Sequence, residues 1–174
     1  MLPHRSLCLA TNVMNQPFQS TPMTVEPQWT DYNGHLNMAY YNVLFDRGGD
    51  QFCDALGIGA NYAQTRRMTI YAAEIHVCYL RELHQGAEVV VTVQLLEHDE
   101  KRLRLYQEMR HSDGWLAATS EALYLHVDMS GPKVAPFPAD RWAVIQDMQT
   151  LHDDLPLPGR AGKRISLSNA KSNI

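Results

Sequence analysis

The feature that most constrains the fold is a series of four long β-rich runs that follows a single helical pattern. The runs read "MTIYAAEIHVCYL", "AEVVVTVQLLEHD", "RLRLYQEMRHSDG" and "WLAATSEALYLHVD", within residues 68–128 of the 174-residue chain. Their connectors "RELHQG", "EHDEK" and "HSDG" are rich in turn-forming and charged residues. Long runs joined by short turns predict an antiparallel meander.

The segment 38–56, ahead of these runs, has apolar residues at the three- and four-residue spacing of a helix. Its stripe consists of Tyr41, Leu44, Phe45, Gly48, Phe52 and Leu56. Asn37 directly precedes the segment and is a suitable helix cap. Gly48 and Gly49 each cost roughly 0.8–1 kcal/mol of helix stability relative to alanine, so we expect close packing of this helix against the sheet.

The rest of the chain has weaker patterns. A short run at 23–29 has strand composition, but Pro27 suits an edge or a bulge better than a central strand. A helical pattern starts after Pro138 and ends before Pro156. We therefore expect an α+β fold with about five antiparallel strands and a long central helix. The predicted parts are a flexible N-terminal extension at 1–20, a domain including the C-terminal helix at 21–155 and a tail at 156–174.

Composition and charge limit the partners of this chain. A net charge of -4 and a sequence pI near 6.0 give no general field that would attract nucleic acid or an anionic membrane surface. No run approaches the length of a membrane span. The three cysteines stand at irregular spacings without a CxxC pair, which suits a reducing compartment. We expect a cytoplasmic protein with no nucleic-acid or membrane partner.

The stretch "DYNGHLN" at 31–37 places an acid, a histidine, two asparagines and a glycine between two apolar segments. Each of these residue types is common in turns, and Asn37 alone could be only a cap. An acid directly before a helix could also act as a general base or a nucleophile. The free N–H groups of the first helical turn would then face developing negative charge. Both interpretations remain open at this point.

The longer stretch "WTDYNGHLNMAYYNVLFDRGGD" resembles the acyl-CoA thioesterases of the hydroxybenzoyl-CoA thioesterase-like group, which have the hotdog fold. The signature of this group is an Asp, then Gly-His, then Asn at the start of the central helix. The resemblance extends from about Val25 to Pro138. More narrowly, "DYNGHLN", "KRLRLYQEMRH" and "LPLPGRAGKRI" are similar to the betainyl-CoA thioesterases of carnitine breakdown, including the domain fused to some carnitine dehydrogenases. This chain lacks a dinucleotide-binding domain, so only the thioesterase portion carries over.

The resemblance implies a thioester hydrolase that cleaves a short acyl-CoA, with a polar or cationic acyl group of the betainyl kind, to the free acid and CoA. It places the catalytic carboxylate on Asp31 and gives supporting roles to His35 and Asn37. Gly34 would allow close approach of the backbone to the ligand, and the helix start at Met38 would polarise the thioester carbonyl. The resemblance implies no cofactor beyond the CoA of the substrate. It also implies a homodimer or a dimer of dimers, with acyl-CoA at the subunit interface.

Glu74 and His76 lie two residues apart in "AEIHVCYL", so they share one face of a strand. If that face lines the cleft, Glu74 could pair with a cationic acyl group such as trimethylammonium, with tyrosines as walls. The candidate walls are Tyr40, Tyr41 and Tyr71. The alternative is an ordinary amphipathic strand with Glu74 and His76 in solvent.

Metal and phosphate ligands give weaker signals. His76 and Cys78 could form half of a zinc site, but no second pair of ligands stands at a recognisable spacing, so we predict no metal. Cations at loop positions could meet the phosphates of CoA. They are Arg66, Arg67, Lys101 and Arg102. Most charges of this kind are simply solvated.

Two other functions are compatible with a hotdog protein. One is a non-catalytic acyl-CoA-binding protein, because each polar residue of the turn would be ordinary in a plain binding cleft. The other is an enoyl-CoA hydratase or dehydratase, which would require a His base and a carboxylate in a different loop arrangement. Ligand binding without hydrolysis would indicate the first, and hydration of an enoyl-CoA the second.

Overall fold

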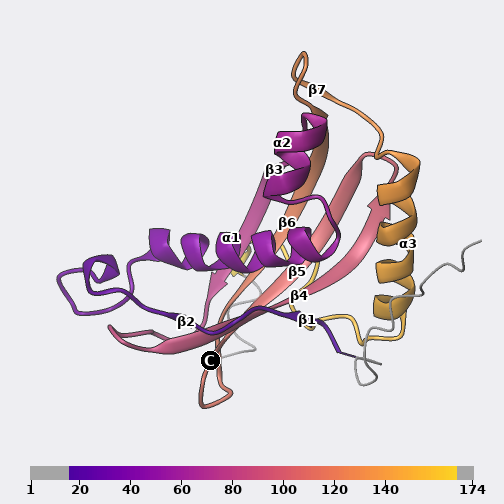
Figure 1. The fold of residues 1–174 in the computed structure, drawn as a ribbon. Coiled ribbons are helices and arrows are strands. Elements are labelled where there is room, and N and C mark those ends of the chain that lie inside the picture. The colour runs from indigo at the N-terminus through magenta and orange to yellow at the C-terminus, as the bar shows by residue number, and fades with distance from the viewer. Residues whose placement is uncertain (1–15, 168–174) are drawn as a thin grey trace, which may run out of the picture.

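The computed structural model describes residues 16–167, in which a curved antiparallel sheet is crossed by helix α1 (Met38–Ala55) (Figure 1). The long strands are β3 (Met68–Tyr79), β4 (Glu88–Asp99), β5 (Arg102–His111) and β6 (Leu116–Asp128). The short strands are β1 (Phe18–Gln19), β2 (Met23–Thr24) and β7 (Lys133–Val134). The other helices are the 3-10 turn η1 (Pro27–Trp29), α2 (Ala60–Arg66) and α3 (Ala139–Asp153).

The strand order is β1-β4-β5-β6-β3, with β2 also paired to β4 and β7 to β6. The β4–β5 and β5–β6 connections are the predicted hairpins. The meander prediction is wrong for β3, which pairs antiparallel with β6 at the far edge of the sheet rather than with β4. The reason is the connector 80–87, which crosses the sheet beside the start of α1. Leu36 N–H donates to the Leu83 carbonyl at 2.7 Å, and Leu83 N–H donates to the Tyr41 hydroxyl at 3.2 Å.

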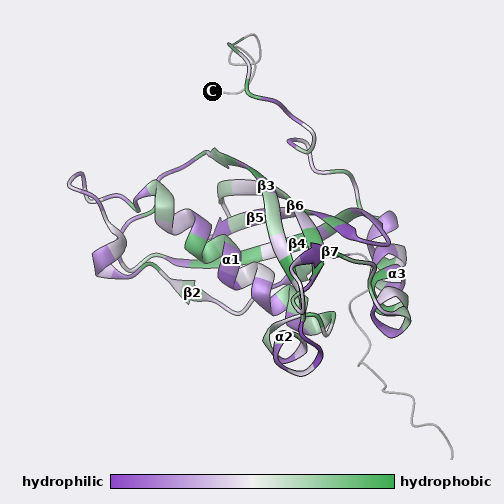
Figure 2. Cartoon of the chain, turned by 90° about the horizontal axis from the view of Figure 1, so that it is seen from above, coloured by the Kyte–Doolittle hydropathy of each residue, from purple (hydrophilic) through white to green (hydrophobic). Residues whose placement is uncertain are grey.

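Helix α1 packs against the sheet through its apolar stripe, as the spacing predicts. Leu44, Phe52 and Leu56 are fully buried, while polar residues alternate with them along the helix (Figure 2). A Cβ atom at Gly48 would lie 2.6 Å from the Val91 Cβ atom, a distance that real contacts do not show. Gly48 therefore allows the close approach of helix and strand that its position predicts. This central helix and its wrapping sheet form an α+β hotdog fold.

Both ends of the folded region differ in detail from the sequence prediction. Residues 1–15 and 168–174 lie outside the described residues, but Phe18 and Gln19 within the expected flexible extension pair with β4. The run at 23–29 forms only a two-residue strand before η1 begins at Pro27, because proline has no N–H for a sheet hydrogen bond. The described part of the tail is irregular, and Gly162 N–H anchors it to the Glu121 carboxylate at 2.7 Å.

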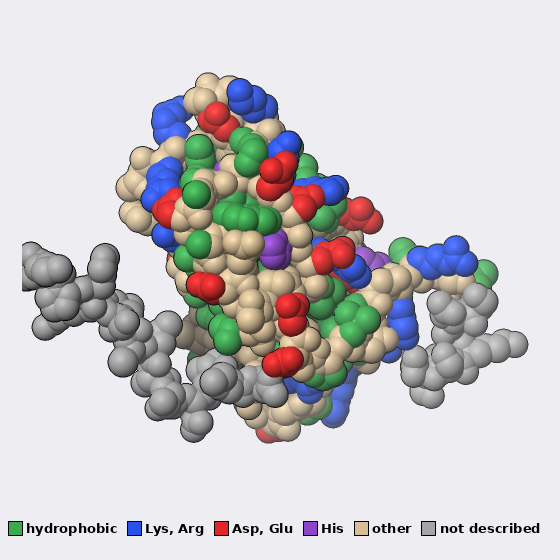
Figure 3. All heavy atoms as spheres, turned by 90° about the vertical axis from the view of Figure 1, so that its right-hand side faces the viewer, with side chains coloured by type: hydrophobic (Ala, Val, Ile, Leu, Met, Phe, Trp, Pro, Cys, Tyr) green, Lys and Arg blue, Asp and Glu red, His purple; other side chains and the backbone are tan. Residues whose placement is uncertain are grey.

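The face that carries α3 mixes acidic and basic side chains with scattered apolar ones (Figure 3). Helix α3 packs against β4, where His152 Nδ1 accepts a hydrogen bond from Leu95 N–H at 2.8 Å. Burial lowers the pKa of His152, which suits the neutral form that this bond requires. Within residues 16–167, no helix has the length and apolar character needed to cross a membrane.

Candidate functional site

The stretch 31–37 forms the tip of a small hairpin between η1 and α1. Asp31 N–H donates to the His35 carbonyl at 2.8 Å, and Gly34 N–H donates to the Asp31 carbonyl at 3.0 Å. Asn37 N–H closes the hairpin on the Trp29 carbonyl at 2.9 Å. Gly34 has a φ of 79°, a conformation that favours glycine. The sequence motif is therefore a turn, and this turn holds its polar side chains in fixed positions.

Asp31 is half-buried, and one of its carboxylate oxygens organises the turn. Oδ1 accepts hydrogen bonds from Asn33 N–H at 2.8 Å and His35 N–H at 3.3 Å. Among the described residues, Oδ2 has no hydrogen-bond partner. One oxygen thus fixes the carboxylate, and the other is available to a water molecule or a substrate carbonyl.

The start of α1 follows directly on the hairpin that carries Asp31. Asn37 caps the helix as predicted, because its Oδ1 accepts from Ala39 N–H at 3.0 Å. Tyr40 N–H is bonded to the Asn37 carbonyl, so Met38 N–H is the first-turn donor left for a ligand. The hairpin places Asp31 two residue pairs from Asn37, roughly 7 Å along the strand direction. A negative charge that develops between Asp31 and Met38 would meet the positive end of the helix dipole.

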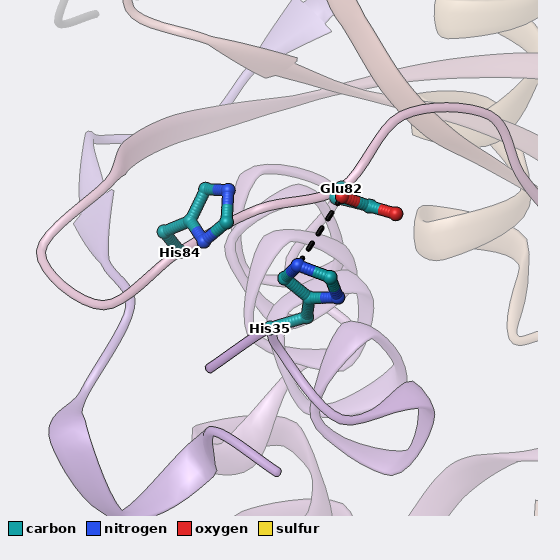
Figure 4. Close-up of side chains that lie close together, drawn as sticks. All are labelled: His35, Glu82 and His84. Carbon is teal, nitrogen blue, oxygen red and sulfur yellow. Dashed lines mark ion pairs between the residues drawn. The ribbon is translucent and has the colours of Figure 1, made fainter. Parts of the chain in front are cut away.

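His35 faces two residues that the sequence analysis did not single out (Figure 4). Its Nε2 lies 3.3 Å from Glu82 Oε2, and its ring centroid is 5.0 Å from that of His84. His84 Nδ1 lies 3.2 Å from the Gly34 carbonyl oxygen. Glu82 and His84 belong to the connector 80–87, which in sequence resembles only a turn. Its path across the sheet brings them to the hairpin, and no local pattern indicates that path.

Of the predicted tyrosine walls, Tyr41 has a structural role instead. Its side chain is 5% exposed, and its hydroxyl binds the connector at Arg81 and Leu83. Tyr40 stacks on Trp29 with ring centroids 5.5 Å apart. Tyr71 is half exposed on the edge strand β3, so it remains open to a ligand or to another chain.

Glu74 and His76 share one strand face as predicted, but that face points away from α1. They pair with Leu123 and Glu121 of β6, and with these residues they line a hollow of about 940 Å³ beneath the tail. The face toward α1 carries Ile75 instead. Within one chain, Glu74 and His76 therefore do not line the pocket between α1 and β3, because periodicity shows which residues share a face but not which face a helix covers.

The predicted CoA-binding cations lie at the end of the sheet where β3 begins. The start of α1 lies at the opposite end, because Tyr79, the last residue of β3, donates to the Met38 carbonyl. Arg66 forms two hydrogen bonds with Asp140, at 2.8 and 2.6 Å, and links α2 to α3. The other three cations also have local roles. Lys101 lies near Glu100, Arg102 pairs with Asp99, and Arg67 caps α2 in a left-handed conformation. These four cations do not meet Asp31 within one chain.

A pocket of about 280 Å³ lies between α1 and β3, on the sheet face that α1 covers. Its polar lining consists of Asn42, Asp46, Gln107, Ser120 and Tyr124. It starts one helical turn from Met38, because the Asn42 amide donates to the Met38 carbonyl. Within residues 16–167, the Asp46 carboxylate forms no ion pair or hydrogen bond. Burial, followed by the charges of Asp46 and Asp54, raises the pKa of the neighbouring Asp50. This side of α1 thus carries negative charge that no ion pair among residues 16–167 neutralises.

The fold and the site define a class, namely a hotdog protein with a fixed carboxylate at the start of its central helix. Residues 25–148 match the model of the thioesterase-like superfamily, and the chain belongs to this family. The chain is accordingly a thioester hydrolase.

Individual proteins of known name are also similar to this chain. The chain is 34% identical over 155 residues to a betainyl-CoA thioesterase from Pseudomonas aeruginosa, covering 88% of this chain and 98% of that one. It is 31% identical to an L-carnitine dehydrogenase/betainyl-CoA thioesterase from Rhizobium meliloti, of which it spans only 30%. A Staphylococcus aureus protein in complex with CoA has a similar structure, with a TM-score of 0.81 and 25% identity, covering 91% of this chain and 99% of that one.

Proposed function

We propose that this chain hydrolyses a short acyl-CoA with a positively charged acyl group, of the betainyl-CoA kind, and that Asp31 is its catalytic carboxylate. The observation that carries the proposal is the position of Asp31, which one oxygen anchors in the turn while the other stays free beside the start of α1. The similarity to a betainyl-CoA thioesterase supports the substrate class.

The site supplies both groups that thioester hydrolysis requires. The free oxygen of Asp31 takes a proton from the attacking water, or attacks the acyl carbon itself to form an anhydride that water then cleaves. On either route the C–S bond breaks, and the leaving CoA thiolate takes up a proton from water. Met38 N–H and the helix dipole stabilise the oxyanion that forms on the thioester oxygen. Asn37 holds the helix start in place through its cap, and His35 supports the turn. These steps need no cofactor beyond the CoA of the substrate.

The pocket between α1 and β3 is the proposed site of the acyl group. At about 280 Å³ it lies at the lower limit of ordinary ligand pockets, about 300 Å³, which favours a short acyl chain. Asp46 supplies a negative charge without a partner, and the aromatic ring of Tyr124 lies in the same lining. A buried cation requires such a charge or an aromatic wall. Asp46 therefore takes the role that the sequence analysis gave to Glu74.

The edge strand β3 is the proposed contact with a second copy. It has no neighbour on its outer side within residues 16–167, and its exposed apolar residues are Tyr71, Ile75 and Tyr79. Long unpaired edges of this kind favour pairing with another chain. An antiparallel pairing about a two-fold axis would place the start of the partner's β3, with its Arg66 and Arg67, near the Asp31 end of this chain. CoA phosphates could then meet these cations across the interface.

The dimer proposal predicts a measurable mass. Sedimentation equilibrium should give two or four times the 19.8 kDa of one chain. Replacing Ile75, at the centre of the β3 edge, with Asp should shift the protein toward the monomer. The matched control is Leu167→Asp, since Leu167 is 95% exposed on the tail. A monomeric wild type, or an equal effect of both substitutions, would contradict pairing through β3.

The proposed location is the cytoplasm. Cys53 and Cys78 are free thiols, and burial together with nearby carboxylates raises the pKa of the Cys53 thiol to about 12. Unpaired thiols suit a reducing compartment. CoA esters are the only ligands that the proposal requires.

The experiment that tests the function measures free-thiol release from a panel of acyl-CoAs. The panel contains betainyl-CoA, neutral short-chain esters, aromatic esters and long-chain esters. We expect the highest kcat/KM with betainyl-CoA and little hydrolysis of long chains. CoA esters that bind without releasing thiol would indicate a binding protein, and conversion of an enoyl-CoA to a hydroxyacyl-CoA would indicate a hydratase. Hydrolysis that prefers a neutral ester would leave the enzyme class intact and contradict the cationic substrate.

A further inference from the structure

We infer that His35, Glu82 and His84 form a binding site for a divalent transition-metal ion of the zinc type. Each of the three residues offers one ligand atom, and these atoms lie within 4.8 Å of one another. The sequence analysis predicted no metal, because it considered only His76 and Cys78. The inference does not depend on the identity of the acyl group.

The backbone explains why the three side chains converge. His35 and His84 face each other in an antiparallel bridge between the hairpin and the connector 80–87. Glu82 lies two residues from His84 on the same extended segment, so the two side chains point to the same side. Figure 4 shows His35 directed toward the segment that carries the other two residues. The ligands thus come from two backbone segments held in register, not from one flexible loop.

The hydrogen bond of His84 prepares it for a metal. His84 Nδ1 lies 3.2 Å from the Gly34 carbonyl oxygen, which can only accept a hydrogen bond, so Nδ1 carries the proton. Nε2 of the same ring then has a free lone pair. Histidine ligands of metal ions commonly donate their other N–H to a backbone carbonyl or a carboxylate in this way. The orienting contact of a metal ligand is therefore already present.

The donor set indicates which metal fits. Two imidazoles and one carboxylate are typical of three-ligand zinc sites with a fourth position open to water. Magnesium and calcium prefer sets made of oxygen ligands, and one carboxylate is too few for them. The His35–Glu82 contact of 3.3 Å would be replaced by two bonds to the ion, each about 2.0–2.2 Å long.

The ion would link the turn that holds Asp31 to the connector that crosses the sheet. The two segments meet through the antiparallel bridge of His35 and His84 and the hydrogen bond between Leu36 and Leu83, so a shared ligand should stabilise them together. A ligand that binds only the folded chain raises the unfolding temperature, and the rise grows with the logarithm of the ligand excess. Zinc at about 100 times its dissociation constant should therefore raise the melting temperature by roughly 5–10 °C.

The test measures zinc binding to the full-length, untagged chain by competition with a chromogenic chelator, together with melting curves. We expect one zinc per chain, and at least a tenfold weaker affinity in both His84→Gln and Glu82→Gln. The matched control is His111→Gln, because His111 forms a similar pair with Asp113 at 3.3 Å but has no third ligand. Circular dichroism checks that each variant is folded.

Several outcomes would overturn the inference. They are no zinc binding by the wild type, binding that survives both substitutions, and binding that His111→Gln weakens equally. Binding of magnesium as tight as that of zinc would contradict the assigned metal class. Cobalt provides an independent readout, since a four-coordinate site with His ligands should give visible d–d absorption in the wild type and lose it in His84→Gln.

Discussion

Replacing Asp31 with Asn should lower kcat for the preferred acyl-CoA by at least about 100-fold, the lower limit for loss of a general base. The side-chain amide oxygen of Asn can accept the hydrogen bonds that Asn33 N–H and His35 N–H donate to Asp31 Oδ1, so the turn keeps both bonds. The substitution removes the charge and the basic lone pair on the second oxygen. Because the turn and the helix start are unchanged, KM should change by much less than kcat.

The control for this prediction is Asp113→Asn, in the turn between β5 and β6. Asp113 is a turn carboxylate beside a histidine, as Asp31 is, but it is exposed and lies outside the candidate site. Its replacement should leave kcat within about twofold of wild type, as is usual for a surface substitution. Steady-state thiol release and melting temperature are measured on both variants. An Asp31→Asn enzyme that is folded and nearly as active as wild type would eliminate Asp31 as the catalytic carboxylate.

The elements of the fold could be predicted from local patterns, and their pairing could not. The apolar stripe at 38–56 predicts α1 almost to the residue, and the four β-rich runs match β3 to β6 closely. The error was the neighbour of β3. Its pairing with β6 depends on a crossing connector whose anchor is Leu83 bound by Leu36 and Tyr41. Such contacts join residues more than forty positions apart, and no periodicity within a strand records them.

The same limit applies to the candidate site. The spacing in "DYNGHLN" predicts the turn that begins at Asp31, the helix cap at Asn37 and the left-handed conformation of Gly34, because a turn and a helix start are local structures. Glu82 and His84 were missed, since they meet His35 only through the crossing. The sequence left open which face of its strand Glu74 occupies, since one strand has two faces and only tertiary packing decides which of them α1 covers. The residues of the turn could thus be predicted from the sequence, and the residues that the fold brings next to the turn could not.

Asp46 is expected to determine the preference for a cationic acyl group. It lies eight residues after Met38, roughly 12 Å along the helix axis. The cation in the pocket lies closer to Asp46 than Met38 does, so at an effective dielectric constant of about 20 the carboxylate stabilises it by at least roughly 1.4 kcal/mol. This corresponds to about tenfold in binding. Asp46→Asn should therefore lower kcat/KM for betainyl-CoA about tenfold and leave a neutral ester of similar size almost unchanged.

The matched control for Asp46→Asn is Glu74→Gln, which removes the same charge from the opposite face of the sheet. If the pocket between α1 and β3 holds the acyl group, only Asp46→Asn alters the ratio of the two kcat/KM values. Added salt should reduce the difference between wild type and Asp46→Asn, because screening weakens a charge that acts over roughly 12 Å. The opposite result, with selectivity lost in Glu74→Gln alone, would place the acyl group in the hollow beneath the tail. The acyl group would then lie on the sheet face opposite to α1, and Asp31 could not be the carboxylate that acts on it within the same chain.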